Sequence, residues 1–158
     1  MTAKNSKLAA KQQTTYRQTS GQAMNSLAAR VYYEDTDAAG IVYYANYFHF
    51  LERGRTEFLR TLGHNQSALM QQGIAFAVRS ASAEFLKPAR LDDLLTVETD
   101  IASLGRAQVT FAQRILRDKE LLLDARIRVA CIDPVRGKPI PMPRTLHEQL
   151  SSLPGPSQ

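Results

Sequence analysis

The sequence predicts an α+β fold in which one antiparallel sheet covers a single long helix. Three segments after residue 93 alternate apolar and polar side chains, a longer run rich in small residues precedes them, and links of a few residues separate all four. Ahead of these segments, one stretch repeats apolar residues at spacings of three and four, which indicates an amphipathic helix. Because the sheet would have one apolar face, we expect the long helix to lie across that face.

The first predicted elements are a strand and the long helix. The strand covers SLAARVYYED, residues 26–35, and the helix covers residues 46–62. The apolar stripe of this helix is formed by Tyr47, Phe50, Leu51, Gly54, Phe58 and Leu62. Gly63 follows where a helix commonly ends. A glycine inside the stripe costs about 1 kcal/mol relative to alanine, so Gly54 predicts that another group packs closely against the helix there.

A shorter helix is predicted over residues 65–72, and four strands are predicted over residues 73–87, 94–101, 106–118 and 120–133. The last strand has the clearest alternation. Its expected apolar face carries Leu121, Leu123, Ala125, Ile127, Val129 and Cys131. In the strand over residues 94–101, Thr96, Glu98 and Asp100 alternate with apolar residues, so we expect Asp100 on the polar face.

Composition divides the chain into three parts. Residues 1–26 are polar, carry four basic and no acidic side chains, and predict a disordered arm. Residues 27–145 contain the predicted sheet and helices and form one domain. Residues 146–158 are a C-terminal tail, and the prolines around it exclude a long helix or a central strand. A short helix is expected only over residues 144–153.

Charge and cysteine content indicate the kind of partner and the compartment. The net charge is +5, but the first 26 residues supply four of the 20 basic side chains, so the rest is nearly neutral and is not expected to bind nucleic acid. The single cysteine, Cys131, allows no internal disulfide and suits a reducing compartment. No stretch approaches the roughly 20 apolar residues of a membrane span. We therefore expect a cytoplasmic protein without stable membrane insertion.

Two acidic residues stand between the first strand and the long helix. Asp37 opens the stretch DAAG, which leads into the start of the helix. The unpaired N–H groups at a helix start can hold a carbonyl oxygen as it becomes an oxyanion. A nearby carboxylate can attack the carbonyl carbon or activate a water molecule. Aspartate is also frequent at turns for purely local reasons, and the spacing alone leaves both interpretations open.

The residues around Asp37 resemble the signature of the hotdog-fold acyl-CoA thioesterases. The matching pairs and triplets are Thr36-Asp37, Gly40-Ile41-Val42, Tyr43-Tyr44 and Asn46-Tyr47. The chain is similar to the branch containing 4-hydroxybenzoyl-CoA thioesterase. Within that branch it resembles the bacterial thioesterases associated with the Tol-Pal cell-envelope system, through YYEDTDA and the ERGRTEFLR stretch. The resemblance continues to GKP at residues 137–139 and spans about residues 28–145.

This resemblance implies a hotdog fold, a curved antiparallel sheet wrapped around one central helix. It implies hydrolysis of acyl-CoA to free acid and CoA without a metal or other cofactor, by a homodimer or homotetramer. Carried onto this chain, Asp37 is the nucleophile or general base, and the Tyr44 N–H is the oxyanion donor. Gly40 lets the turn approach the acyl group. The residues expected to hold the CoA phosphates are Lys87, Arg90, Arg106, Arg126 and Arg128.

Several alternatives stay open. Glu57 either pairs with Arg53 four residues earlier or orients the substrate or water. Many members of the Tol-Pal subgroup have histidine where this chain has Tyr44, which leaves the acyl specificity open. The second function class is a non-hydrolytic module that binds an acyl thioester or an acyl-carrier protein. No metal site is expected, since the three histidines lack ligand spacing.

Overall fold

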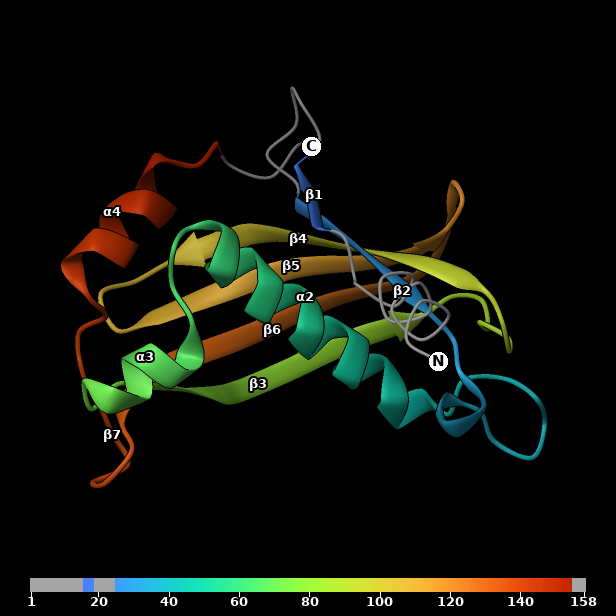
Figure 1. Ribbon diagram of the computed structural model, residues 1–158, viewed down its shortest axis with the longest axis horizontal. Helices are drawn as coiled ribbons and strands as arrows, with labels where there is room; N and C mark the ends of the chain where they lie inside the picture. Colours follow the sequence, from blue (N-terminus) through green and yellow to red (C-terminus); the bar gives the residue numbers. More distant parts are fainter. Residues whose placement is uncertain (1–15, 19–24, 155–158) are drawn as a thin grey trace, which may run out of the picture.

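The computed structural model describes residues 16–18 and 25–154, and it confirms the predicted α+β fold (Figure 1). Within these residues, seven strands form one antiparallel sheet, and the central helix lies across one face of it. The strands are β1 (Tyr16–Gln18), β2 (Asn25–Arg30), β3 (Ala75–Phe85), β4 (Leu94–Leu104), β5 (Gln108–Arg117), β6 (Glu120–Asp133) and β7 (Lys138–Pro139). Their order in the sheet is β1-β2-β4-β5-β6-β3, and β7 pairs with β6.

Three α-helices are described, and their bounds lie within two residues of the prediction. They are α2 (Tyr47–Thr61), α3 (Gln66–Gln71) and α4 (Arg144–Ser152). None of the described helices has the length and apolar content needed to cross a membrane. The Asn65 side chain starts α3 by accepting a hydrogen bond from the Ala68 N–H at 2.8 Å. An N-terminal cap of this kind satisfies one of the free N–H groups of the first turn.

The first predicted strand is shorter than expected. β2 ends at Arg30, and the chain then forms a 3-10 turn, η1 (Tyr33–Asp35). The Asp35 carboxylate accepts a hydrogen bond from the Tyr32 N–H at 2.8 Å, and the Thr36 hydroxyl donates to the Tyr33 carbonyl at 2.8 Å. These local bonds compete with strand pairing, which ends the strand early. The prediction of a continuous strand to residue 35 was therefore wrong.

The core lies between α2 and the sheet, and Gly54 is the point of closest approach. A β-carbon at Gly54 would lie 2.8 Å from Val97 Cγ1, 3.0 Å from Thr99 Oγ1 and 3.1 Å from Gln113 Nε2. Gln113 is fully buried, and its amide donates to the Leu51 carbonyl of α2 at 2.9 Å. The prediction that another group packs closely at Gly54 is confirmed. The buried amide of Gln113 also fixes the helix to the sheet by a polar contact.

The expected exposure of Asp100 was wrong. Its exposed fraction is 1%, and the neighbouring Ile101 is also buried. Asp100 pairs with Ala112 in regular register, and the register between β4 and β5 shifts only after Ile101, so Asp100 keeps its place in the alternation and is nevertheless buried. One carboxylate oxygen of Asp100 accepts from the Ile101 N–H at 2.8 Å, and the other has no hydrogen-bond partner among the described residues. Burial raises the pKa of this carboxyl group.

The two ends of the chain extend the sheet and the core. β1 pairs antiparallel with β2, and the rest of the predicted arm, residues 1–15 and 19–24, lies outside the described residues. The expected short helix near the C-terminus is confirmed as α4. Its Leu146 and Leu150 join the core, and the Gln149 amide donates to the Leu62 carbonyl at 2.8 Å. The division into arm, domain and tail stays a prediction.

Candidate active site

A protruding hairpin carries Asp37. Thr36 and Val42 form a bridge, and between them the Asp37 N–H donates to the Ile41 carbonyl at 2.9 Å. The Gly40 N–H donates back to the Asp37 carbonyl at 3.0 Å, and the φ of Gly40 is 76°. That left-handed conformation favours glycine. The turn therefore gives a local reason for Gly40, while its expected approach to an acyl group stays a prediction.

The Asp37 carboxylate is exposed and has one described contact. Its Oδ1 accepts a hydrogen bond from the Ala39 N–H at 2.8 Å. This bond orients the carboxylate within the turn and leaves Oδ2 without a described partner. Asp35 has a different role, because its carbonyl accepts from the Tyr43 N–H at 3.0 Å and from the Asn46 amide at 2.9 Å. Asp35 therefore holds the two sides of the hairpin base together through its backbone carbonyl.

Tyr44 begins the short 3-10 helix η2 (Tyr44–Asn46), which runs directly into α2. Among the described residues, the Tyr44 N–H has no hydrogen-bond acceptor. It therefore remains available to an oxygen atom supplied from outside the hairpin. The Tyr43 N–H donates to the Asp35 carbonyl at the base of the hairpin, so the Tyr44 N–H follows directly after the hairpin that carries Asp37. The structure therefore places the two predicted site groups on one stretch of chain, which runs from the hairpin into the start of η2.

Aromatic rings cover the base of the hairpin. The Tyr44 and Phe85 rings lie edge to face with centroids 6.2 Å apart, and Tyr47 and Phe85 are 5.7 Å apart. Tyr44 is 60% exposed and Phe85 is 47% exposed. Half-exposed rings next to a free N–H and a carboxylate offer an apolar surface to an acyl group. Phe85 was not among the predicted site residues, because its place in a predicted strand indicates only packing.

The hairpin is attached to the segment between β3 and β4, residues 87–93. The Val42 N–H donates to the Ala89 carbonyl at 2.9 Å, and Ile41 forms a bridge with Arg90. The Ala89 N–H donates to the Tyr47 hydroxyl at 3.0 Å. Ala89 and Val42 are both buried, with exposed fractions of 0% and 3%. The position of Asp37 therefore depends on the position of this segment.

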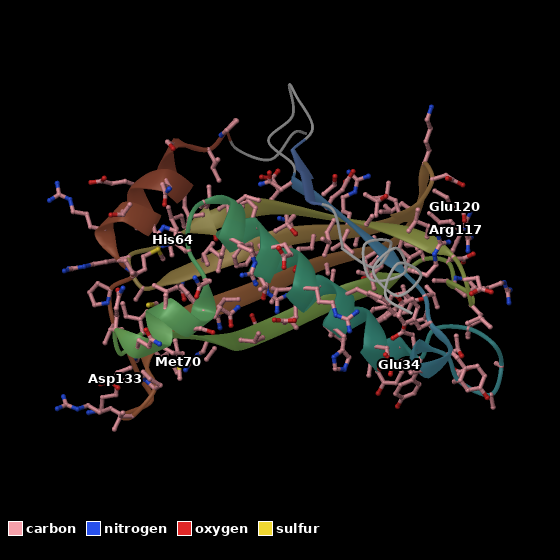
Figure 2. The ribbon with its side chains drawn as sticks, in the orientation of Figure 1. Glu34, His64, Met70, Arg117, Glu120 and Asp133 are labelled. Carbon is pink, nitrogen blue, oxygen red and sulfur yellow. The ribbon has the colours of Figure 1, made fainter. Side chains whose placement is uncertain are left out.

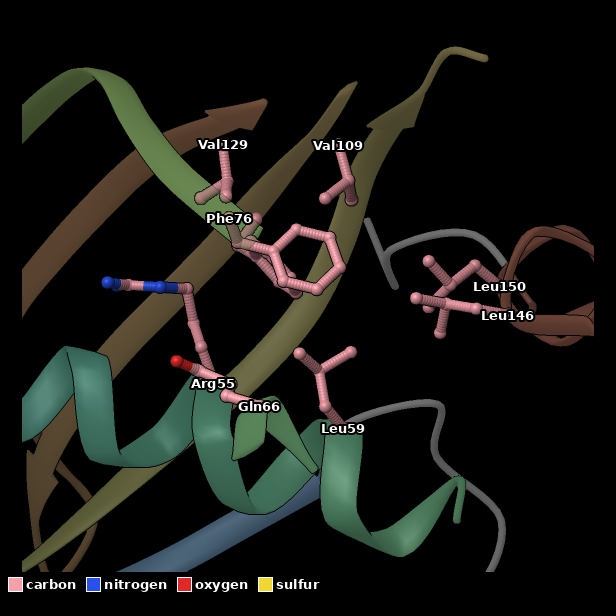
Figure 3. A pocket seen from close by; sticks show the side chains of 9 residues that line it. Arg55, Leu59, Gln66, Phe76, Val109, Val129, Leu146 and Leu150 are labelled. Atoms are coloured by element: carbon pink, nitrogen blue, oxygen red, sulfur yellow. The ribbon is translucent and has the colours of Figure 1, made fainter. Parts of the chain in front are cut away.

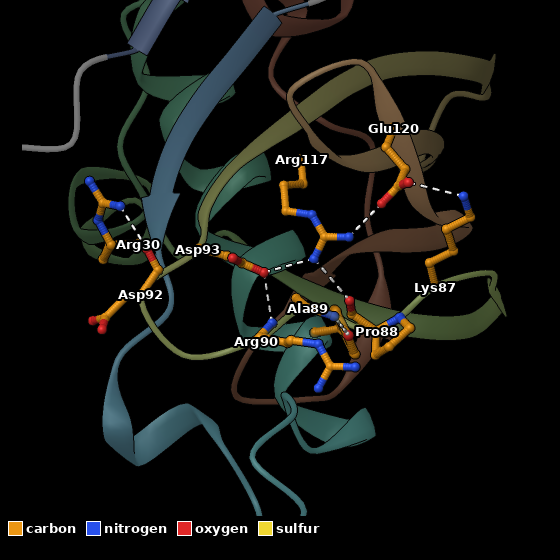
Figure 4. A network of polar contacts seen from close by, with 10 residues as sticks. Arg30, Lys87, Pro88, Ala89, Arg90, Asp92, Asp93, Arg117 and Glu120 are labelled. Carbon is orange, nitrogen blue, oxygen red and sulfur yellow. Dashed lines mark hydrogen bonds and ion pairs between the residues drawn. The ribbon is translucent and has the colours of Figure 1, made fainter.

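A polar network holds the same segment in place (Figure 4). Arg117, at the end of β5, donates to the Pro88 carbonyl at 3.1 Å and to Asp93 Oδ2 at 2.8 Å, and it also pairs with Glu120. Burial alone would raise the pKa of Asp93, but hydrogen bonds from Arg117 and the Arg90 N–H outweigh burial and hold it below its ordinary value. The sequence pattern did not single out Arg117, because a basic residue at a strand end usually indicates only exposure.

The basic residues expected to bind phosphates do not form one cluster within the chain. Arg90 lies beside the hairpin through its bridge with Ile41, and Lys87 pairs with Glu120 at 2.9 Å. Arg126 and Arg128 are exposed on β6, while Arg106 lies in the turn between β4 and β5. Among the five basic residues, Arg90 is therefore the one with a described backbone bridge to the Asp37 hairpin.

Glu57 lies ten residues after the start of α2, which is about 15 Å along the helix axis. It pairs with Arg60 at 3.2 Å rather than with Arg53, which lies over the Phe50 ring instead. Within one chain, no described contact joins Glu57 to the Asp37 hairpin. Its role in orienting a substrate or water stays a prediction.

A small, mostly apolar pocket lies at the other end of α2 (Figure 3). It is lined by Arg55, Leu59, Gln66, Phe76, Val109, Phe111, Val129, Leu146 and Leu150. None of these residues belongs to the hairpin. Figure 2 shows the same separation, because Glu34, in η1 just before the hairpin, and His64, after α2, lie toward opposite ends of the molecule. Among the described residues, no three His, Cys, Asp or Glu side chains gather as a metal-binding group.

Known proteins resemble this chain along most of its length. The family profile described as "Thioesterase superfamily" matches residues 39–123. Acyl-CoA thioesterase YbgC of Haemophilus influenzae is 46% identical over 120 residues, which are 75% of this chain and 88% of that protein. Acyl-CoA thioester hydrolase YbgC of Escherichia coli O6:H1 is 47% identical over 118 residues, covering 74% and 88%.

Solved structures agree with this relationship. A probable thioesterase from Bartonella henselae is 40% identical, with a TM-score of 0.72 over 76% of this chain and 99% of that one. A hypothetical protein from Aquifex aeolicus is 30% identical, with a TM-score of 0.75 over 79% and 98%. The sheet that curves around α2 is the hotdog fold predicted from the sequence. The chain belongs to the thioesterase superfamily.

Proposed function

We propose that this protein is an acyl-CoA thioesterase that hydrolyses the thioester to a free acid and CoA. The observation that carries the proposal is the exposed Asp37 carboxylate on the hairpin, with the start of η2 directly after the hairpin, where the Tyr44 N–H has no acceptor among the described residues. Similarity to the YbgC proteins, which are named as acyl-CoA thioesterases, supports the substrate class. Membership of the thioesterase superfamily supports the reaction type.

In the proposed mechanism, the thioester carbonyl lies between the hairpin and the aromatic surface of Tyr44 and Phe85. The Tyr44 N–H donates to the carbonyl oxygen, and this bond strengthens as negative charge develops there. Asp37 attacks the carbonyl carbon directly, or it takes a proton from a water molecule that attacks instead. The tetrahedral intermediate then collapses and expels the CoA thiolate, which breaks the C–S bond. After water attack this step gives the free acid, whereas after direct attack it leaves an acyl–Asp37 anhydride that a water molecule hydrolyses to the free acid, which restores Asp37. Asp37 Oδ2 is the oxygen left free for this step, because Oδ1 accepts from the Ala39 N–H.

Phosphate binding is proposed for the basic set, beginning with Arg90. Its backbone is bridged to Ile41, so its exposed guanidinium is anchored beside the turn. Lys87, Arg106, Arg126 and Arg128 complete the proposed set. They are spread over the chain, so a joint role requires that chains assemble around the ligand.

We propose assembly into a homodimer through β3, and a homotetramer as a pair of such dimers. β3 lies at one edge of the sheet and pairs only with β6 among the described strands. Its Val78 is 54% exposed and Phe85 is 47% exposed. A long exposed edge strand with apolar side chains is suited to pairing with a second copy. This pairing would continue the sheet and place Phe85 at the junction of two chains.

The finer family position is also proposed. The aromatic side chain of Tyr44 supports the branch containing 4-hydroxybenzoyl-CoA thioesterase, and the YYEDTDA stretch supports association with the Tol-Pal system. A cytoplasmic location and an acyl-carrier-protein partner remain expectations from the sequence.

The test is hydrolysis of short-chain, long-chain and aromatic acyl-CoAs, followed by thiol release. Asp37→Asn is the informative variant, because its side-chain oxygen can still accept from the Ala39 N–H while the base is lost. We expect a loss of kcat of at least about 100-fold, the range of a missing acid–base or nucleophilic group. Glu34→Gln is the matched control, since Glu34 is an exposed carboxylate in η1, just before the hairpin, and it should retain activity.

If Asp37→Asn hydrolyses acyl-CoA as fast as the wild type does, the proposed role of Asp37 is contradicted. If the wild type hydrolyses no acyl-CoA but does hydrolyse an acyl thioester on acyl-carrier protein, the substrate class is corrected. Binding of either thioester without hydrolysis would favour the non-hydrolytic module.

A further inference from the structure

We propose that Arg117 is a positioning residue that sets the geometry of the Asp37 hairpin through the segment over residues 87–93. This inference rests on the proposed function and names a residue that holds the site without touching the substrate. Arg117 belongs to β5, far from Asp37 in the sequence. Its effect reaches the hairpin through backbone hydrogen bonds that the structure shows one by one.

The first step is the contact of Arg117 with the segment. One nitrogen, Nη1, donates both to the Pro88 carbonyl at 3.1 Å and to Asp93 Oδ2 at 2.8 Å. Asp93 Oδ2 accepts a second hydrogen bond, from the Arg90 N–H at 2.8 Å. One guanidinium therefore joins both ends of the stretch that contains Ala89 and Arg90. The planar fork of arginine lets Nη1 hold the segment while Nη2 contacts Glu120. Lysine presents a single charged nitrogen, which cannot serve the segment and Glu120 from two separate positions.

The second step is the contact of this stretch with the hairpin. The Ala89 carbonyl accepts from the Val42 N–H at 2.9 Å, and Arg90 is bridged to Ile41. Ile41 also accepts the hydrogen bond of the Asp37 N–H, at 2.9 Å. A shift of Ala89 and Arg90 would therefore move both sides of the turn. Since reacting groups tolerate little displacement, an error of about 1 Å can reduce the rate roughly 100-fold.

Glu120 supplies a matched comparison. It contacts the same guanidinium through the other terminal nitrogen, Nη2, and it pairs with Lys87 at 2.9 Å. It has no described contact with residues 88–93. Figure 4 shows Glu120 on the far side of Arg117 from Asp93 and Pro88. Loss of the Glu120 charge therefore changes the surroundings of Arg117 while leaving its bonds to the segment in place.

The experiment compares Arg117→Lys with Glu120→Gln in the full-length protein by hydrogen exchange and by kinetics. In Arg117→Lys, we expect the Val42 amide to exchange about tenfold faster and kcat to fall between about 10- and 100-fold, with KM changed less than about threefold. Glu120→Gln should match the wild type in both measurements. A role limited to global stability would instead speed exchange throughout the chain and leave kcat per folded molecule unchanged.

Unchanged exchange of the Val42 amide in Arg117→Lys would overturn the inference, whether or not any thioester is hydrolysed. An equal loss of kcat in Glu120→Gln would overturn it as well. If the wild type and Arg117→Lys both turn over normally while Asp37→Asn does not, the proposed function stands and this inference fails. If Arg117→Lys does not fold, Asp93→Asn weakens the same contact from the acceptor side and must speed Val42 exchange.

Discussion

Gly54 determines how closely the central helix approaches the sheet. A methyl group there would lie 2.8 Å from Val97 and 3.1 Å from the buried amide of Gln113. Both neighbours are buried and held in place, Val97 by packing and Gln113 by its bonds to Leu51 and Thr99. The site cannot expand without moving the helix away from β4 and β5.

We therefore predict that Gly54→Ala lowers stability, although alanine favours a helix by about 1 kcal/mol. Overpacking of this kind costs about 1–3 kcal/mol, so a net loss is expected as a lower melting temperature. His49→Ala on the exposed face of α2 is the control for helix propensity and should be neutral or slightly stabilising. A Gly54→Ala protein at least as stable as the wild type would contradict the packing described here.

Asp100 allows a prediction of pH dependence. Burial raises the pKa of its carboxyl group, so the folded state favours the protonated form more than the unfolded state does. The stability from this group is present below its unfolded pKa and is lost as pH rises through the folded pKa. Asp100→Asn should consequently raise the melting temperature at neutral pH.

The gain from Asp100→Asn should shrink as the pH falls and the wild-type carboxyl group becomes protonated. Melting curves of both proteins between pH 7 and about pH 4, near the ordinary pKa of aspartate, test this. An equal difference at every pH would show that charge at Asp100 is not the cause.

At the scale of elements, the sequence predicted most of the fold from periodicity. The bounds of α2 and β6 follow directly from their apolar spacing, because each buries one face in the core. The pattern failed where side chains bond to nearby backbone, as Asp35 does, and at Asp100, which is buried although it stands on the expected polar face of β4. Neither a local hydrogen bond nor the covering of a polar position leaves a periodic signal.

The candidate site was predictable only in part for the same reason. Asp37 and Tyr44 are near each other in the sequence, so motif and order indicated them together. Arg117, Asp93 and Phe85 reach the hairpin through the tertiary fold, and their sequence positions give no hint of it. Contacts of Glu57 and of the five basic residues with a second copy of the chain would lie between chains, so the sequence pattern within one chain does not predict them.

The short helix α3 provides a prediction for one element. Asn65 caps it through a 2.8 Å bond from the Ala68 N–H, and Leu69 is the buried residue of the helix. Asn65→Ala should lower stability by about 1 kcal/mol through loss of the cap. Asn65→Asp keeps the acceptor and should lose far less, as chemical denaturation of the three proteins would reveal. Equal losses would indicate that the cap is not the stabilising contact.

At the scale of the whole molecule, the exposed edge of β3 is the main feature to be explained. Other strands of the sheet core are paired on both sides, whereas β3 has one described neighbour. We predict that Val78→Asp shifts the native mass from a multiple of the chain mass toward a single chain, because like charges would meet at a symmetric edge. Light scattering after size-exclusion chromatography measures this.

The control is Lys119→Asp, which adds an acidic group at an exposed position in the turn before β6, away from the β3 edge. A second substitution on β3, such as Ser80→Asp, would not serve, because it adds charge to the same edge. A Val78→Asp protein that keeps the wild-type mass would place the contact between chains elsewhere.

The contact between Gly54 and the sheet has a consequence for related sequences. Positions 54, 97 and 113 share one small volume, so the residues that fill it are not free to change independently. Homologous chains with alanine or serine at position 54 should carry a smaller residue at position 97 or 113. The substitution Val97→Ala should likewise make Gly54→Ala more tolerable in this chain, as coupled neighbours in a double-mutant cycle do. Evolution at these three positions is therefore expected to proceed by compensating pairs.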